Sequence, residues 1–119
     1  MAAVRVDMQE ERTQRALQYL GLATRAGRVV VGVPLICTAL SKGAKGKTPV
    51  LVVKANDASA NTAKRITDRC AHYGVPLLEL ACDCSTLAQR IGKGDAAVAA
   101  VGVIDESLSA AIRTLFEHN

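Results

Sequence analysis

Gly46-Lys47-Thr48 is the part of this sequence that most resembles a phosphate-binding motif. In a P-loop the triplet follows a strand and opens a helix, so that backbone N–H groups surround the phosphates. It also needs a glycine five residues before Gly46, where this chain has Ser41. Here a helix is expected before the triplet, and Pro49 with a strand is expected after it. The sequence therefore predicts no nucleotide binding at this loop.

Gly92-Lys93-Gly94 is a second basic glycine turn, and it also follows a helix and precedes a strand. Two interpretations remain open for it: a contact with an RNA backbone, or an ordinary tight turn. No catalytic set of residues is found, because neither His72 nor His118 has an evident nucleophile partner and helix capping explains Asp57. The four cysteines form no C-x-x-C pair, so neither a metal site nor a cofactor is predicted.

Positive charge is concentrated in the first half of the chain. Residues 25–69 carry nine lysines and arginines against two aspartates, a net charge of +7, whereas residues 70–119 have a net charge of −3. This asymmetry favours an anionic partner, although an ordinary solvated surface with unevenly placed lysines is the alternative. Only three aromatic residues are present, so the stacking surface used by many single-strand RNA binders is missing.

The length of 119 residues predicts one domain, residues 1–119, with a core of Ala, Val, Leu and Ile. No apolar run approaches the roughly 20 residues of a membrane span. The N-terminus also lacks the apolar segment of a secretion signal, so a cytoplasmic location is expected.

Hydrophobic periodicity predicts alternating helices and strands, with residues 1–9 as a flexible tail. Helices are expected at about 10–26, 34–42, 59–73, 85–91 and 105–116, with strands at 28–31, 50–55, 77–80 and 96–104. Short links between them indicate an α/β fold in which a small sheet lies between helices.

Several separated blocks of this chain resemble one known family. They are Gly21-Leu22-Ala23-x-Arg25-Ala26-Gly27-Arg28, Gly32 with Ala39-Leu40-x-Lys42-Gly43, the stretch from Val50 to Thr62, Cys70-x-x-Tyr73-x-Val75-Pro76, and Leu87 with Ile91-Gly92-Lys93. In this order they are similar to the large-subunit ribosomal proteins of the seven-Ae and thirty-e type, a kink-turn RNA-binding superfamily, and within it to the bacterial YlxQ-like branch. The resemblance covers nearly all of residues 16–116.

The resemblance implies a three-layer α/β/α sandwich with a four-stranded mixed sheet. It also implies binding to kink-turn RNA, a sharply bent helix with tandem sheared G·A pairs. In that family the turn after the first strand reads G-x-N-E-x-x-K, and its Asn, Glu and Lys contact the G·A bases. Here Gly32 is retained, but Pro34, Leu35 and Thr38 stand at the three base-reading positions.

The sequence therefore predicts a non-enzymatic, ribosomal-protein-like component of a ribonucleoprotein that acts in translation and binds structured, kink-turn-like or rRNA-like RNA with altered or weakened base specificity. The residues expected to bind RNA are Arg28, Gly32, Thr38, Lys42, Lys45, Lys47, Lys54 and Lys93. The ribosome or another protein is a further candidate partner. The alternative is a protein–protein adaptor on the same fold that has lost specific RNA reading.

Overall fold

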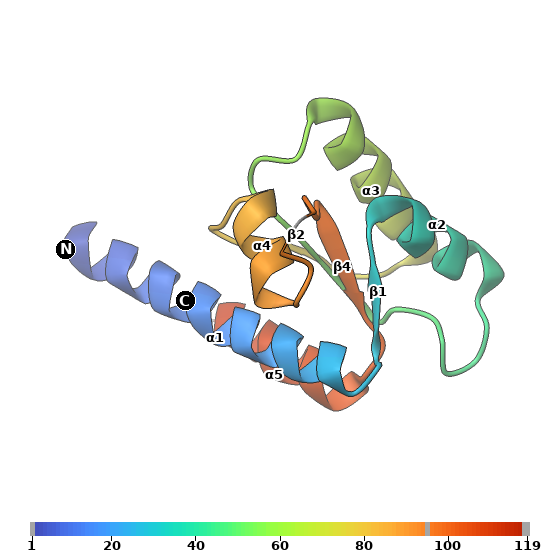
Figure 1. Ribbon diagram of the computed structural model, residues 1–119, viewed down its shortest axis with the longest axis horizontal. Helices are drawn as coiled ribbons and strands as arrows, with labels where there is room; N and C mark the ends of the chain where they lie inside the picture. The colour runs from blue at the N-terminus through green and yellow to red at the C-terminus, as the bar shows by residue number, and fades with distance from the viewer. Residues whose placement is uncertain (1, 95, 118–119) are drawn as a thin grey trace.

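The computed structural model describes residues 2–94 and 96–117, in which helices and strands alternate along the chain (Figure 1). In order they are α1 (Ala2–Arg25), β1 (Val29–Val31), α2 (Val33–Lys42), β2 (Leu51–Lys54), α3 (Ala60–Tyr73), β3 (Leu77–Glu79), α4 (Cys84–Arg90), β4 (Ala100–Val103) and α5 (Glu106–Phe116). The strands form one sheet in the order β1-β4-β2-β3. β2 and β3 are parallel, and β4 is antiparallel to both of its neighbours. The predicted four-stranded mixed sheet is confirmed.

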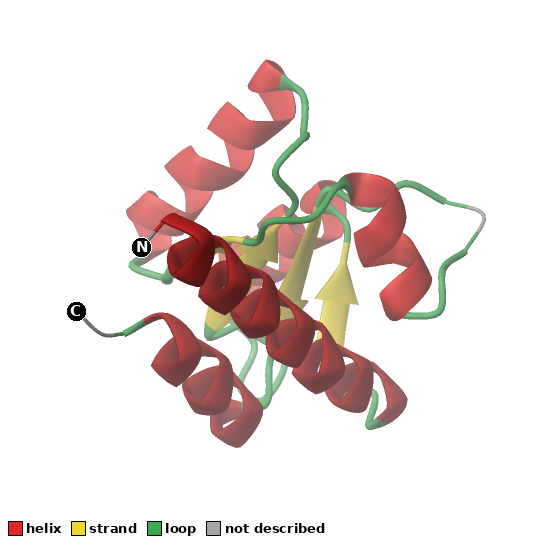
Figure 2. Ribbon diagram, turned by 90° about the vertical axis from the view of Figure 1, so that its left-hand side faces the viewer, coloured by secondary structure: helices red, strands yellow, loops and turns green. Residues whose placement is uncertain are grey.

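Two helical layers enclose the sheet, because successive strand side chains point to opposite faces. Helices α1, α4 and α5 pack on the face that includes Leu51, Val53 and Val101. Helices α2 and α3 pack on the other face, which includes Val52 and Ala100. Figure 2 looks onto the first layer, with α1 passing in front of the strands. The predicted three-layer α/β/α architecture is therefore confirmed, and the buried core is almost wholly aliphatic.

Side-chain caps define where three of the helices begin. The Ser59 hydroxyl accepts a hydrogen bond from the Thr62 N–H at the start of α3, and the Asp105 carboxylate accepts one from the Leu108 N–H at the start of α5. For α3 the sequence left Asp57 and Ser59 open as the cap, and for α5 it predicted Asp105. Asp83 caps α4 in the same way, because its carboxylate accepts a hydrogen bond from the Thr86 N–H. This hydrogen bond lowers the pKa of the Asp83 carboxyl group. Such caps stabilise a helix by about 1 kcal/mol each.

Two elements start more than one residue away from the position that the sequence predicts. Helix α1 begins at Ala2 rather than near Glu10, because residues 2–9 contain no Gly or Pro and several good helix formers; the flexibility of residues 1–9 stays a prediction. Strand β4 begins at Ala100 rather than Ala96. The Val98 N–H donates to the Cys84 carbonyl at 3.3 Å, so Val98 is bonded to α4, whereas the Ala99 carbonyl accepts from the Ala55 N–H just after β2. No helix within the described residues is both long and apolar enough to cross a membrane.

Gly21 lies in the interior of α1, and we expect Gly21→Ala to stabilise the protein by about 0.5–1 kcal/mol. A Cβ at this position would lie 3.6 Å from the Arg90 carbonyl oxygen and 3.9 Å from Arg25 Nη1, which are ordinary contacts. The gain comes from the backbone entropy that glycine loses when the helix forms. Urea unfolding measures it, with Gly94→Ala in a loop as the control. A loss of stability would show that α1 and α4 pack too closely for a methyl group.

Candidate nucleic-acid interface

Gly32 forms the turn that joins the edge strand β1 to α2. Its φ of +95° lies in the region that only glycine adopts without strain. The Gly32 N–H donates to the Ala100 carbonyl oxygen at 3.0 Å, and the Gly32 carbonyl accepts the first helical bond, from the Ile36 N–H at 3.0 Å. The turn is therefore bonded on one side to the sheet and on the other to α2, and it fixes where α2 begins.

The three residues that the resemblance aligns with the family's base-reading positions lie on the outer face of α2. Pro34, Leu35 and Thr38 are exposed, and Leu35 shows 62% of its surface to solvent. The opposite face of the helix buries four apolar side chains, Val33, Ile36, Cys37 and Leu40. The Thr38 hydroxyl donates to the Pro34 carbonyl at 3.1 Å, so its proton is used within the helix. This surface holds an apolar patch and one hydroxyl acceptor where the family motif has an amide, a carboxylate and an ammonium.

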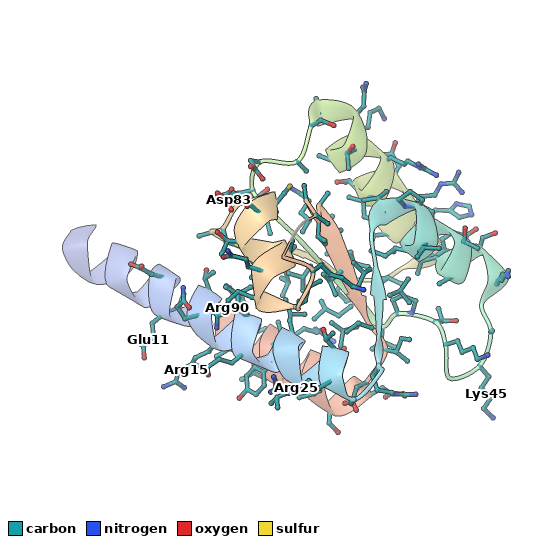
Figure 3. The ribbon with its side chains drawn as sticks, in the orientation of Figure 1. Glu11, Arg15, Arg25, Lys45, Asp83 and Arg90 are labelled. Atoms are coloured by element: carbon teal, nitrogen blue, oxygen red, sulfur yellow. The ribbon has the colours of Figure 1, made fainter. Side chains whose placement is uncertain are left out.

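A second group of predicted residues lies at the other end of α2. Lys42 is in the last turn, and Lys45 and Lys47 follow it in the exposed loop, where Lys45 points away from the body of the protein (Figure 3). The Arg28 side chain reaches this loop, where its Nη1 donates to the Gly46 carbonyl oxygen at 3.5 Å. The Thr48 hydroxyl also donates to the Ala44 carbonyl, at 2.8 Å. Four cations are thereby brought to the amino ends of β1 and β2.

Lys54 and Lys93 do not join that cluster. The register places Lys54 opposite Ala100, and Gly32 bonds to the same residue, so Lys54 lies at the Gly32 end of the sheet. Its ammonium group forms an ion pair with Glu79 of β3, and its side chain is only 15% exposed. Lys93 is exposed in the loop between α4 and β4, and its N–H donates to the Ala88 carbonyl of α4. The predicted basic surface is thus divided between the two ends of α2.

The cysteines are not arranged for nucleophilic or metal chemistry. Burial raises the pKa of Cys70 to about 11, and burial together with the Asp57 carboxylate raises the pKa of Cys84 to about 11. A thiol with so high a pKa is protonated at neutral pH and is a poor nucleophile. Asp57 accepts a hydrogen bond from the Cys84 N–H at 2.7 Å, so it caps the start of α4 and not that of α3. Within the described residues, no three His, Cys, Asp or Glu side chains are grouped to hold a metal ion.

A groove of about 340 Å³ runs between β1 and α2, and the sequence analysis did not anticipate it. It is lined by Val29, Val30, Val31, Leu35, Thr38, Ala39, Lys42, Ala44 and Lys47. The only sequence signal is the run of three valines without a charged neighbour on the helix side. The groove exists because β1 is the edge strand, a position set by pairing with β4, some 70 residues later in the chain.

Comparison with known proteins identifies the family. Residues 14–112 match the ribosomal protein L7Ae/L30e/S12e/Gadd45 family. The chain is 34% identical over 110 residues to the RNA-binding protein YlxQ of Enterococcus faecium, covering 92% of this chain and 99% of that protein. It is 42% identical over 82 residues to the RNA-binding protein YlxQ of Bacillus subtilis (strain 168), covering 69% and 77%.

Solved structures show the same fold. A Bacillus halodurans protein described as having unknown function superposes with a TM-score of 0.75 at 28% identity, covering 87% of this chain and 97% of that one. The Giardia lamblia 15.5kD RNA binding protein superposes with a TM-score of 0.69 at 14% identity, covering 88% and 84%. The resemblance found in the sequence is therefore confirmed, and the chain belongs to the ribosomal protein L7Ae/L30e/S12e/Gadd45 family.

Proposed function

We propose that this protein binds structured RNA and that it is not an enzyme. The observation that carries the proposal is family membership over residues 14–112, together with two relatives that are named as RNA-binding proteins and cover most of the chain. The expected RNA is kink-turn-like or rRNA-like, and the expected setting is a cytoplasmic ribonucleoprotein that acts in translation. No cofactor takes part in this proposal.

The proposed RNA surface follows α2 from one end to the other. Gly32 forms the turn before the helix, Thr38 lies on its outer face, and Lys93 is exposed in the loop between α4 and β4. At the end of α2, Arg28, Lys42, Lys45 and Lys47 supply four positive charges. These charges attract the phosphates of either RNA strand but do not distinguish one base from another. Lys54 contributes less than the sequence suggested, because Glu79 already neutralises its ammonium group.

Base reading is proposed to be weak. Neither the Pro34 ring nor the Leu35 side chain offers a hydrogen-bond donor or acceptor. The Thr38 proton is already donated to the Pro34 carbonyl, which leaves only its oxygen lone pairs for a base. A good hydrogen-bonded base contact is worth about 1–3 kcal/mol of discrimination. We therefore expect affinity dominated by phosphates, with only a small preference for kink-turn RNA over a regular duplex.

Salt dependence tests this proposal. Filter binding of a kink-turn RNA and a matched regular duplex, at a series of salt concentrations, should show affinity for both RNAs that falls steeply with salt. Replacing Lys42, Lys45 and Lys47 by glutamine should reduce the magnitude of the slope by roughly 0.7–0.9 per lysine. The matched control is Lys64→Gln with Arg65→Gln and Arg69→Gln, which removes the same charge from α3. If the protein bound neither RNA at low salt, the proposed function would be contradicted.

The adaptor alternative has one observation in its favour: Leu35 is 62% exposed beside Pro34, on the helix face to which the resemblance assigns base reading. Isolation from cells with and without nuclease treatment separates the two functions. An adaptor would keep its protein partner after the RNA is digested, whereas an RNA-dependent association would be lost.

A further inference from the structure

The edge strand β1 has an open side that the fold does not use. β1 pairs only with β4, through bonds that include Ile104 N–H to the Arg28 carbonyl and Gly32 N–H to the Ala100 carbonyl. In an antiparallel pair such bonds alternate, so the backbone groups of Val30 point toward β4 and those of Val29 and Val31 point away from it. Within residues 2–94 and 96–117, no other backbone segment bonds to these outward groups.

The groove of about 340 Å³ lies directly along this open side. It is lined by the three valines of β1, by Leu35 and Ala39 of α2, and by Ala44 and Lys47 of the loop that follows α2. Proteins usually protect edge strands by keeping them very short, or with charges, proline or a bulge. β1 is short, at three residues, but its three valines include no charge, proline or bulge. The surface thus combines unpaired backbone N–H and C=O groups with an adjoining apolar groove. An added strand can hydrogen-bond to these backbone groups and place alternate side chains in the groove.

RNA fits this groove poorly, although it fits the charges around it. None of the lining residues is aromatic, so the groove offers no surface on which a base can stack. Apart from Thr38, Lys42 and Lys47, the residues that line it have no side-chain partner for phosphate oxygens. The alternating N–H and C=O groups of an edge strand are matched by an extended peptide backbone instead.

Charge decides between a partner protein and a second copy of this chain. Lys42 and Lys47 line the groove, and Arg28 immediately precedes β1. Pairing of two β1 edges would bring residues 28–48 of both copies together, and this stretch contains four basic residues and no acidic one. Self-association would add like charges without compensation. A segment with carboxylates beside Lys42 and Lys47 is complementary.

We propose that the free edge of β1 and the groove under α2 bind an extended acidic segment of a partner protein, which adds a fifth strand to the sheet. β1 is roughly 10 Å long, so the paired part of the segment spans about three to five residues. Alternate side chains of this segment are apolar and enter the groove, and its acidic residues lie near Lys42 and Lys47. This inference does not rest on RNA binding.

The first test uses a fluorescein-labelled peptide, Glu-Asp-Val-Ile-Val-Thr-Val, with the full-length protein. Fluorescence anisotropy should show saturable binding, weakened at least about tenfold by Lys42→Glu with Lys47→Glu. Arg65→Glu with Arg69→Glu, which changes the charge of α3 equally, should leave the affinity within about twofold. Equal binding of a peptide with two lysines in place of its acidic residues would overturn the proposal.

The second test distinguishes strand addition from charge attraction. With saturating peptide, amide hydrogen exchange should slow at least about tenfold at Val29 and Val31, while Val30, already bonded to β4, changes little. Of two peptides N-methylated at odd or at even positions, only one should retain binding, because alternate amides face β1. Uniform or absent protection would overturn the proposal. So would the same protection produced by a kink-turn RNA, or by raising the protein concentration alone, since RNA or a second copy would then occupy the edge.

Discussion

Replacing Pro34 by Asn, Leu35 by Glu and Thr38 by Lys is expected to raise the selectivity for kink-turn RNA over a matched duplex by at least about 100-fold. These substitutions restore an amide, a carboxylate and an ammonium at the base-reading positions of the family motif. A base contact is worth about 1–3 kcal/mol of discrimination, and three contacts at the lower end of this range give this factor. Because the three residues are neighbours, their effects need not add, and the selectivity can be higher or lower than the sum. Filter binding with the two RNAs at one salt concentration measures it.

The fold accommodates all three changes, so the experiment tests recognition rather than folding. All three positions are exposed. Gly32 is the N-cap of α2, which makes Leu35 the third helical residue, and α2 has no acidic residue in its first turn. Glutamate at that position interacts favourably with the helix dipole, by about 0.3–1 kcal/mol. Lysine is also a better helix former than threonine at position 38.

A matched control separates base reading from charge. Thr114 of α5 is exposed, and its hydroxyl donates to the carbonyl four residues earlier, as that of Thr38 does. Leu22 of α1 is 46% exposed. The pair Leu22→Glu and Thr114→Lys therefore repeats the charge changes far from α2 in the sequence, and it should leave the selectivity unchanged. If the triple variant gained no more than this control, α2 would not be the base-reading element of this protein.

The fold was largely predictable because its signals are local. Strand–helix alternation, Ser59 and Asp105 as caps, and the valine-rich β2 each depend on a few neighbouring residues. The family resemblance also predicted that the sheet has four strands of mixed orientation, which hydrophobic periodicity alone does not show. The early start of α1 and the late start of β4 were missed for different reasons. α1 begins with an N-terminal segment of weak amphipathic pattern, and β4 is shortened by a bond between Val98 and Cys84 that joins distant parts of the chain.

The candidate site was less predictable, because it depends on which strands become neighbours. A count of charges between residues 25 and 69 treats Lys54 as equivalent to Lys45. Pairing of β2 with β3 places Lys54 beside Glu79, 25 residues away, and cancels its charge. The edge position of β1 could not be predicted for the same reason, because β1 pairs with β4, the last strand of the chain. Sequence spacing identified the residue types of the site but not their separation into two groups.

Gly102→Ala is expected to lower the free energy of unfolding by about 1–3 kcal/mol. Gly102 lies in the central strand β4, between Val30 and Val52. A Cβ at this position would lie 2.8 Å from Cγ and 3.0 Å from Cβ of Pro49, which is closer than carbon atoms approach without displacement. The ring cannot move away easily, because it is buried and the next N–H, from Val50, donates to the Val103 carbonyl at 2.9 Å. Urea unfolding measures the loss.

A double-mutant cycle with Pro49→Ala identifies the cause. Removing Cγ of Pro49 takes away the shortest contact, so Gly102→Ala should cost less in this background than in the unsubstituted protein. Gly94→Ala is the control, since its Cβ would meet nothing within 4 Å and the change should stay within about 0.5 kcal/mol. Additive costs would show that Pro49 is not the obstacle. A positive coupling would show that the absence of a side chain at Gly102 is what lets Pro49 pack on the sheet at the end of the loop that carries Lys45 and Lys47.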